Sequence, residues 1–71
     1  MTLTPEKRRR TLLLLRNGNV SRLAPDAALT YTVGLVVADE EGIVRRPDVE
    51  RALADPAIVS IARELLRRAR S

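Results

Sequence analysis

The chain has 71 residues and a formal net charge of +4 at pH 7, with twelve arginines and one lysine against nine acidic residues. It contains no His, no Cys and a single aromatic residue, Tyr31. It therefore lacks the side chains that most enzymes use for proton transfer near neutral pH, for thiol chemistry and for soft-metal binding. This composition argues against an enzyme and predicts one small domain, residues 1–71, that binds a partner without a cofactor or a metal ion.

A chain of this length buries only about 60% of the surface that its unfolded form exposes, so its core should be marginal. Because no disulfide or Cys/His metal site can add stability, we expect extra burial from close helix packing or from a second copy. A homodimer is the favoured expectation. The longest purely leucine run, residues 12–15, is too short for a membrane span or a signal-peptide core, so we expect no membrane partner and a cytoplasmic location.

The first predicted helix runs from about Pro5 to Arg16. Thr4 can cap its free N–H groups, and proline suits the first turn because that turn leaves its N–H groups unpaired. Asn17 and Gly18 tolerate the left-handed conformation that follows a helix end.

Four consecutive leucines, Leu12 to Leu15, occupy the end of this helix. At about 100° per residue they point to every side, so the helix cannot rest a single stripe on a core and leave the rest in water. Two interpretations follow: a central core helix, or a surface that meets a second copy or another protein. Leu13 and Leu14 are candidate interface residues in the second case.

The middle of the chain is ambiguous. Residues 24–28 predict a short helix with Pro25 in its first turn. From Leu29 to Val37 alternate residues share one face, and residues 39–42 could turn the chain into a second strand over 43–46, which predicts a β-hairpin. A helix with Thr30 as N-cap and Gly42 past its C-terminus is the alternative. The β-branched content favours the strand and the neighbouring helices favour the helix, so both remain open.

The C-terminal third predicts a short helix from Arg46 to about Ala54 and a last helix that begins at Asp55-Pro56. The last helix has one apolar face, formed by Ile58, Ile61, Ala62, Leu65, Leu66 and Ala69. Glu64 and Arg68 stand at the favourable i, i+4 spacing on the other side. The predicted fold is mostly α, a small helical domain of four to five short helices, with a β-hairpin over residues 29–46 as the open alternative.

Positive charge gathers near both ends of the chain. Lys7-Arg8-Arg9-Arg10 lies in the first turns of a helix, where four cations oppose the helix dipole and one another. A phosphate backbone would relieve this conflict, and the released counterions would make the affinity fall with salt. We therefore predict phosphate contacts to DNA, with modest sequence discrimination, from Lys7, Arg8, Arg9, Arg10, Arg16 and Arg22. A second basic stripe, Arg63, Arg67 and Arg70, is typical of a solvated helix face.

Residues 23–37 resemble the helix-turn-helix family of DNA-binding domains. The matching positions are Ala24 as the packing alanine of the first helix, Ala28 as the turn, Leu29 as the hydrophobic residue after it, Thr30 as the cap of the recognition helix, and Val33 and Val37 on the core side. The resemblance implies transcription regulation and a recognition helix that contacts DNA through Tyr31 and Thr32. The segment departs from the family pattern in residue type at four positions: Ala28 replaces the usual turn glycine, Gly34 stands where a packing valine or isoleucine is expected, and Leu35 and Val36 occupy groove-facing positions that suit polar or basic residues.

A protein-binding function is the alternative. In that case the chain is an adaptor or inhibitor that docks on a larger protein machine through an apolar surface, with Leu13, Leu14, Leu35 and Val36 at the interface. The acidic run at residues 39–41 indicates a charged turn rather than a cation site, because adjacent acids lack the alternating ligand spacing of a calcium loop.

Overall fold

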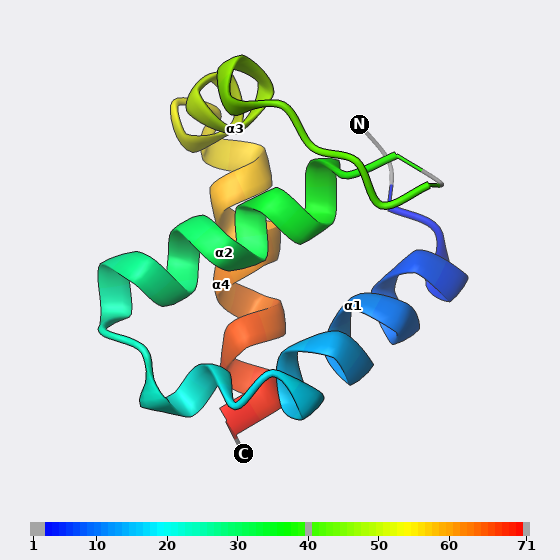
Figure 1. Ribbon diagram of the computed structural model, residues 1–71, viewed down its shortest axis with the longest axis vertical. Coiled ribbons are helices and arrows are strands. Elements are labelled where there is room, and N and C mark those ends of the chain that lie inside the picture. Colours follow the sequence, from blue (N-terminus) through cyan, green and yellow to red (C-terminus); the bar gives the residue numbers. More distant parts are fainter. Residues whose placement is uncertain (1–2, 40, 71) are drawn as a thin grey trace.

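The computed structural model describes residues 3–39 and 41–70 (Figure 1). These residues form α1 (Pro5–Asn17), the 3₁₀ turn η1 (Val20–Arg22), α2 (Pro25–Val37), α3 (Arg46–Leu53) and α4 (Pro56–Arg70). The prediction of a mostly helical domain is confirmed. None of the described residues forms a strand, so the β-hairpin alternative for residues 29–46 is wrong.

Each α-helix has a proline at its first or second position: Pro5, Pro25, Pro47 and Pro56. Proline stabilises a helix start because its fixed φ is helical and its missing N–H would be unpaired there anyway. At α1 the cap is also present, since Thr4 Oγ1 accepts a hydrogen bond of 3.2 Å from the Lys7 N–H. The predicted boundaries of the first, third and last helices agree with the structure to within about a residue.

The second helix is longer than predicted. α2 is continuous from Pro25 to Val37, and the expected turn at Ala28 is wrong, because the Ala28 N–H donates to the Ala24 carbonyl at 2.8 Å. Thr30 does not cap a new helix; its hydroxyl donates to the Asp26 carbonyl at 3.0 Å. The buried face of α2 supplies the reason: Ala28, Thr32, Val33 and Val36 follow helical spacing, and their packing outweighs the strand preference of the β-branched residues.

After α2 the chain enters the loop of residues 38–45. Asp39 organises the loop, because its Oδ1 accepts hydrogen bonds of 2.9 Å from the N–H groups of both Glu41 and Ile43. Gly42 has a φ of +81°, in the left-handed region that favours glycine. The helical alternative expected Gly42 directly after a helix end. In the structure Gly42 lies within this loop instead. Glu40 lies outside the described residues.

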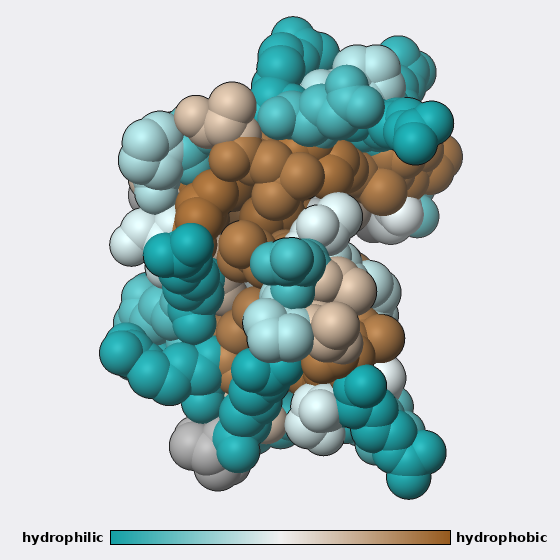
Figure 2. Space-filling view, turned by 90° about the vertical axis from the view of Figure 1, so that its left-hand side faces the viewer, coloured by the Kyte–Doolittle hydropathy of each residue, from teal (hydrophilic) through white to brown (hydrophobic). Residues whose placement is uncertain are grey.

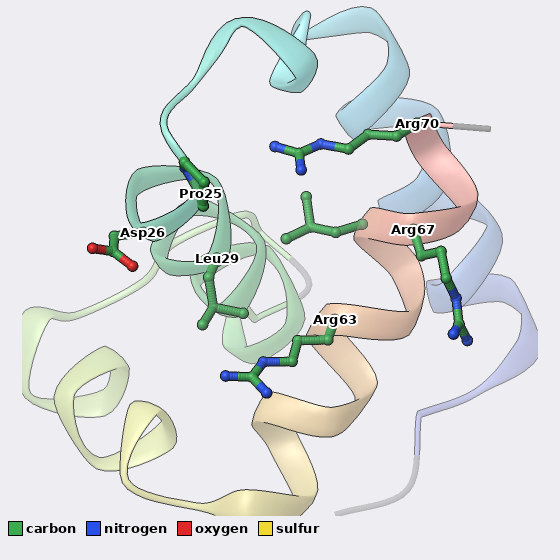
Figure 3. A pocket seen from close by; sticks show the side chains of 7 residues that line it. Pro25, Asp26, Leu29, Arg63, Arg67 and Arg70 are labelled. Atoms are coloured by element: carbon green, nitrogen blue, oxygen red, sulfur yellow. The ribbon is translucent and has the colours of Figure 1, made fainter.

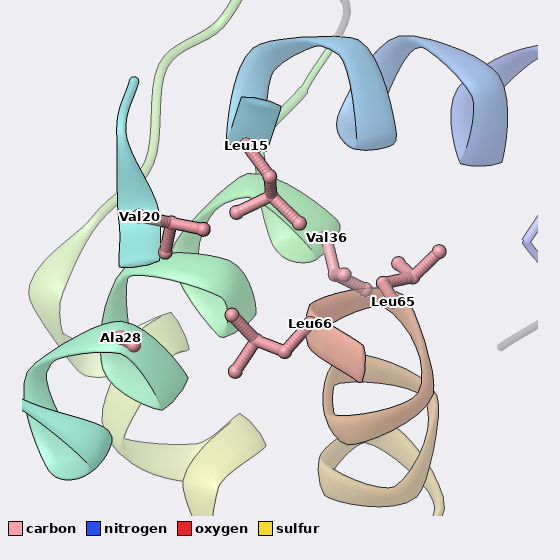
Figure 4. Packing of buried hydrophobic residues seen from close by; sticks show 6 residues of the cluster. All are labelled: Leu15, Val20, Ala28, Val36, Leu65 and Leu66. Carbon is pink, nitrogen blue, oxygen red and sulfur yellow. The ribbon is translucent and has the colours of Figure 1, made fainter. Parts of the chain in front are cut away.

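The core lies where α4 meets α1, η1 and α2. Figure 4 shows one cluster of buried residues from these four elements: Leu15, Val20, Ala28, Val36, Leu65 and Leu66. A second cluster, Val33, Ala52 and Ala62, joins α2 to α3 and α4. The predicted apolar face of α4 is confirmed, since Ala62, Leu65 and Leu66 are buried and the other three residues of that face are partly buried.

The leucine run of α1 divides between inside and outside. Leu15 is fully buried, whereas the side chains of Leu13 and Leu14 are 60% and 44% exposed. α1 is therefore a peripheral helix with one covered side, and the central-helix interpretation is wrong.

Candidate nucleic-acid interface

The predicted basic segment 7–10 divides into two halves. Lys7 Nζ donates to the carbonyl oxygen of Ala38 at 2.7 Å, and Arg8 Nη2 lies 2.9 Å from Glu64 Oε2. Ala38 follows the C-terminus of α2, where a cation compensates the negative end of the helix dipole. The protein itself thus relieves the charge conflict at Lys7 and Arg8, which act as internal contacts between α1 and its neighbours.

Glu64 is the acidic partner at the centre of this arrangement. Its Oε1 lies 3.3 Å from Arg68 Nη2, which confirms the predicted i, i+4 pair, while its Oε2 holds Arg8 of α1. The Arg8 contact was missed, since the sequence alone does not show that α1 and α4 are neighbours. In the sequence, the only sign that Glu64 forms an ion pair is its i, i+4 spacing to Arg68.

Arg9 and Arg10 are the exposed half of the segment. Neither side chain forms a hydrogen bond or ion pair with any residue of the described ranges. Both remain available to an external partner.

A larger group of arginines gathers where the C-terminal ends of α1 and α4 meet. Arg16 Nη2 reaches the Arg68 carbonyl oxygen at 3.5 Å, and η1, which carries Arg22, contacts α4 at the same end (Figure 1). We call this region the basic end, formed by Arg16, Arg22, Arg67, Arg68 and Arg70. The side chains of Arg22, Arg67 and Arg70 are exposed and have no partner among the residues that the structure describes.

A groove between α2 and α4 adjoins the basic end. It encloses about 490 Å³ and is lined by Pro25, Asp26, Leu29, Arg63, Leu66, Arg67 and Arg70. In Figure 3 the Arg63 and Arg70 side chains extend toward α2, whereas Arg67 and the Asp26 carboxylate point away from the groove. The groove thus extends the exposed positive charge along α4, over an apolar floor that includes Leu29.

The opposite end of the molecule has the opposite charge. The described residues from Asp39 to Pro56 include five acidic residues against three arginines, a balance of −2. Two of these arginines are paired nearby, Arg46 with Glu50 at 3.9 Å and Arg51 with Asp48 at 2.8 Å. On the side shown in Figure 2, hydrophilic groups cover the top and the lower part, and an apolar band lies below α3.

The contacts predicted on the middle helix are partly wrong. Thr32 and Val36 are both 0% exposed, and the Thr32 hydroxyl donates to the Ala28 carbonyl at 2.7 Å, so neither side chain can meet DNA or a protein partner. Leu35 is partly buried against the core. Tyr31 is 42% exposed and remains a candidate contact.

The described ranges contain neither a metal-binding cluster nor a membrane-spanning helix. No cluster of three or more His, Cys, Asp or Glu side chains there is arranged to hold a metal ion. No described helix combines the length and the apolar character needed to cross a bilayer. Comparisons with protein-family models, curated proteins and solved structures give no match.

Proposed function

We propose that this protein is a small, non-enzymatic DNA-binding regulatory or accessory protein whose basic end contacts the phosphate groups of a duplex. One observation carries the proposal: arginines from three elements converge at the basic end, and Arg22, Arg67 and Arg70 have no carboxylate partner in the described structure. An exposed, unpaired guanidinium is well suited to phosphate, because its planar fork of donors matches two phosphate oxygens.

The uneven charge distribution gives the complex an orientation. Asp48, Glu50 and Asp55 lie in or next to α3, away from the C-terminal end of α4, so a polyanion is attracted to the basic end and repelled by the other. This differs from the helix-turn-helix expectation, in which residues of the middle helix face the DNA. In our proposal η1 and α4 supply the main contacts, with Arg9 and Arg10 as further candidates on α1.

The proposed contacts predict modest sequence discrimination. Arginines that bind phosphate fix the position of a protein on the duplex but carry no direct information about the bases. Among the predicted contacts of the middle helix, Thr32 is buried, which leaves Tyr31 as a candidate for touching a base.

The test is a fluorescence-anisotropy titration of the protein against a labelled random-sequence duplex. We expect the triple variant Arg22→Gln, Arg67→Gln, Arg70→Gln to bind about tenfold or more weakly, since three phosphate contacts are lost. Arg45→Gln is the matched control, because Arg45 is also exposed and has no side-chain partner in the described ranges, but lies before α3. Equal losses in the triple variant and the control, or no loss in the triple variant, would refute the proposal.

A further inference from the structure

The outward side of α1 carries apolar surface that phosphate binding does not use. Leu13 and Leu14 are adjacent on α1, and their side chains are 60% and 44% exposed. We call Leu13 and Leu14 the leucine patch. Single exposed apolar residues are ordinary, whereas two large adjacent ones are a candidate interaction surface.

Positive charge borders the leucine patch. Arg9 and Arg10 precede Leu13 by four and three residues, so they share one side of the helix with it, and Arg16 follows. All three arginines are exposed, and Arg9 and Arg10 have no partner among the described residues. The complementary surface is therefore apolar at its centre and acidic at its edges.

We propose that the leucine patch binds an amphipathic helix of a partner protein whose apolar side is flanked by Asp and Glu. An amphipathic helix presents apolar anchors at i, i+3, i+4 and i+7, which can pack against the exposed leucines of α1, and the flanking acids pair with Arg9 and Arg10. The inference stands apart from the main DNA contacts, because Arg22, Arg67 and Arg70 neither belong to the patch nor border it.

The charges also decide between this occupant and others. A second copy that used the same face would bring Arg9, Arg10 and Arg16 of both chains together, and facing like charges are unfavourable. A nucleic acid would satisfy the arginines but would leave the leucines against phosphates, in an interface type that is polar and strongly charged. An acidic amphipathic helix satisfies both features.

The experiment uses the full chain and two synthetic peptides of about 15 residues, the length at which a helix becomes marginally stable. One peptide has leucines at i, i+3, i+4 and i+7 with glutamates beside them, and the other has glutamine at every glutamate position. We expect the glutamate peptide to bind, and the glutamine peptide to bind about fivefold or more weakly because the charge pairing is lost.

Protein variants complete the test. Leu13→Asp should weaken binding of the glutamate peptide about tenfold or more, and Arg9→Gln with Arg10→Gln should remove most of the preference for glutamate. Ile43→Asp is the control, since Ile43 is 55% exposed in the loop of residues 38–45, outside the patch. Circular dichroism verifies that each variant keeps its helices.

Four results would overturn the inference. The first two are equal binding of the two peptides and unchanged binding of the glutamate peptide by Leu13→Asp. The third is a dimer that Leu13→Asp dissociates while no peptide binds. The fourth is binding of the protein through the patch to anionic phospholipid vesicles while no peptide binds. None of them depends on whether the triple arginine variant loses DNA, so the two proposals fail separately.

Discussion

At the scale of single residues, the surroundings of a side chain decide its role more than its type does. Lys7 and Arg8 contact the Ala38 carbonyl and Glu64, whereas the next two arginines have no partner in the described structure. Four adjacent cations in the sequence look alike, and nothing in it separates the internal pair from the external pair. The separation comes from the position of α1 against α2 and α4.

The ion pair between Arg8 and Glu64 gives a first prediction. Because both side chains remain partly exposed, Arg8→Gln should lower the free energy of unfolding by no more than about 1 kcal/mol. A double-mutant cycle with Glu64→Gln, followed by urea denaturation, measures the coupling. In the same preparation Arg8→Gln should change DNA affinity less than any single substitution at Arg22, Arg67 or Arg70. A larger loss of DNA affinity would mean that Arg8 itself contacts DNA.

Two glycines should respond in opposite directions to alanine. A Cβ at Gly34, inside α2, would meet nothing within 4 Å, so Gly34→Ala should raise the free energy of unfolding by about 0.5–1 kcal/mol. Gly42 has a φ of +81°, so Gly42→Ala should lower it by about 1–2 kcal/mol. Urea denaturation of both variants measures the difference, and a destabilised Gly34→Ala would contradict the packing around α2.

At the scale of elements, local signals and tertiary packing contributed differently. The starts of α1, α3 and α4 could be predicted because Pro5, Pro47 and Pro56 favour the first turn of a helix through local geometry alone. The extent of α2 could not be predicted. Its segment has both a strand-like alternation and a helical face, and contacts with α3 and α4 select the helix, which a single sequence does not show.

The orientation of α1 can be tested with two leucines of the same run. Leu15 is fully buried, so Leu15→Ala should lower the free energy of unfolding by about 2–5 kcal/mol through lost burial and a cavity. Leu13 is mostly exposed, and Leu13→Ala should change it by no more than about 0.5 kcal/mol. Thermal or urea unfolding compares the two variants, and similar losses would mean that α1 is covered on both sides.

At the scale of the whole molecule, the separation of charge is the feature that leads to function. The sequence already suggested that positive charge gathers near both ends of the chain. It did not suggest that Arg16 and Arg22 from the first part of the chain would join Arg67 and Arg70 from the last part, because the meeting of α1, η1 and α4 is a property of the fold. The helical spacing of Arg63, Arg67 and Arg70 predicted a basic stripe on the last helix. Its proposed role in DNA binding follows from the arginines of α1 and η1 that lie beside it.

The salt dependence of DNA binding tests the phosphate-binding account most directly. If Arg22, Arg67 and Arg70 each neutralise a phosphate, a plot of the logarithm of the association constant against that of the salt concentration should become shallower by about 2–3 units in the triple glutamine variant. Arg45→Gln should leave the wild-type slope unchanged. A wild-type affinity that does not fall with salt, or a slope that the triple variant shares with the wild type, would contradict the account.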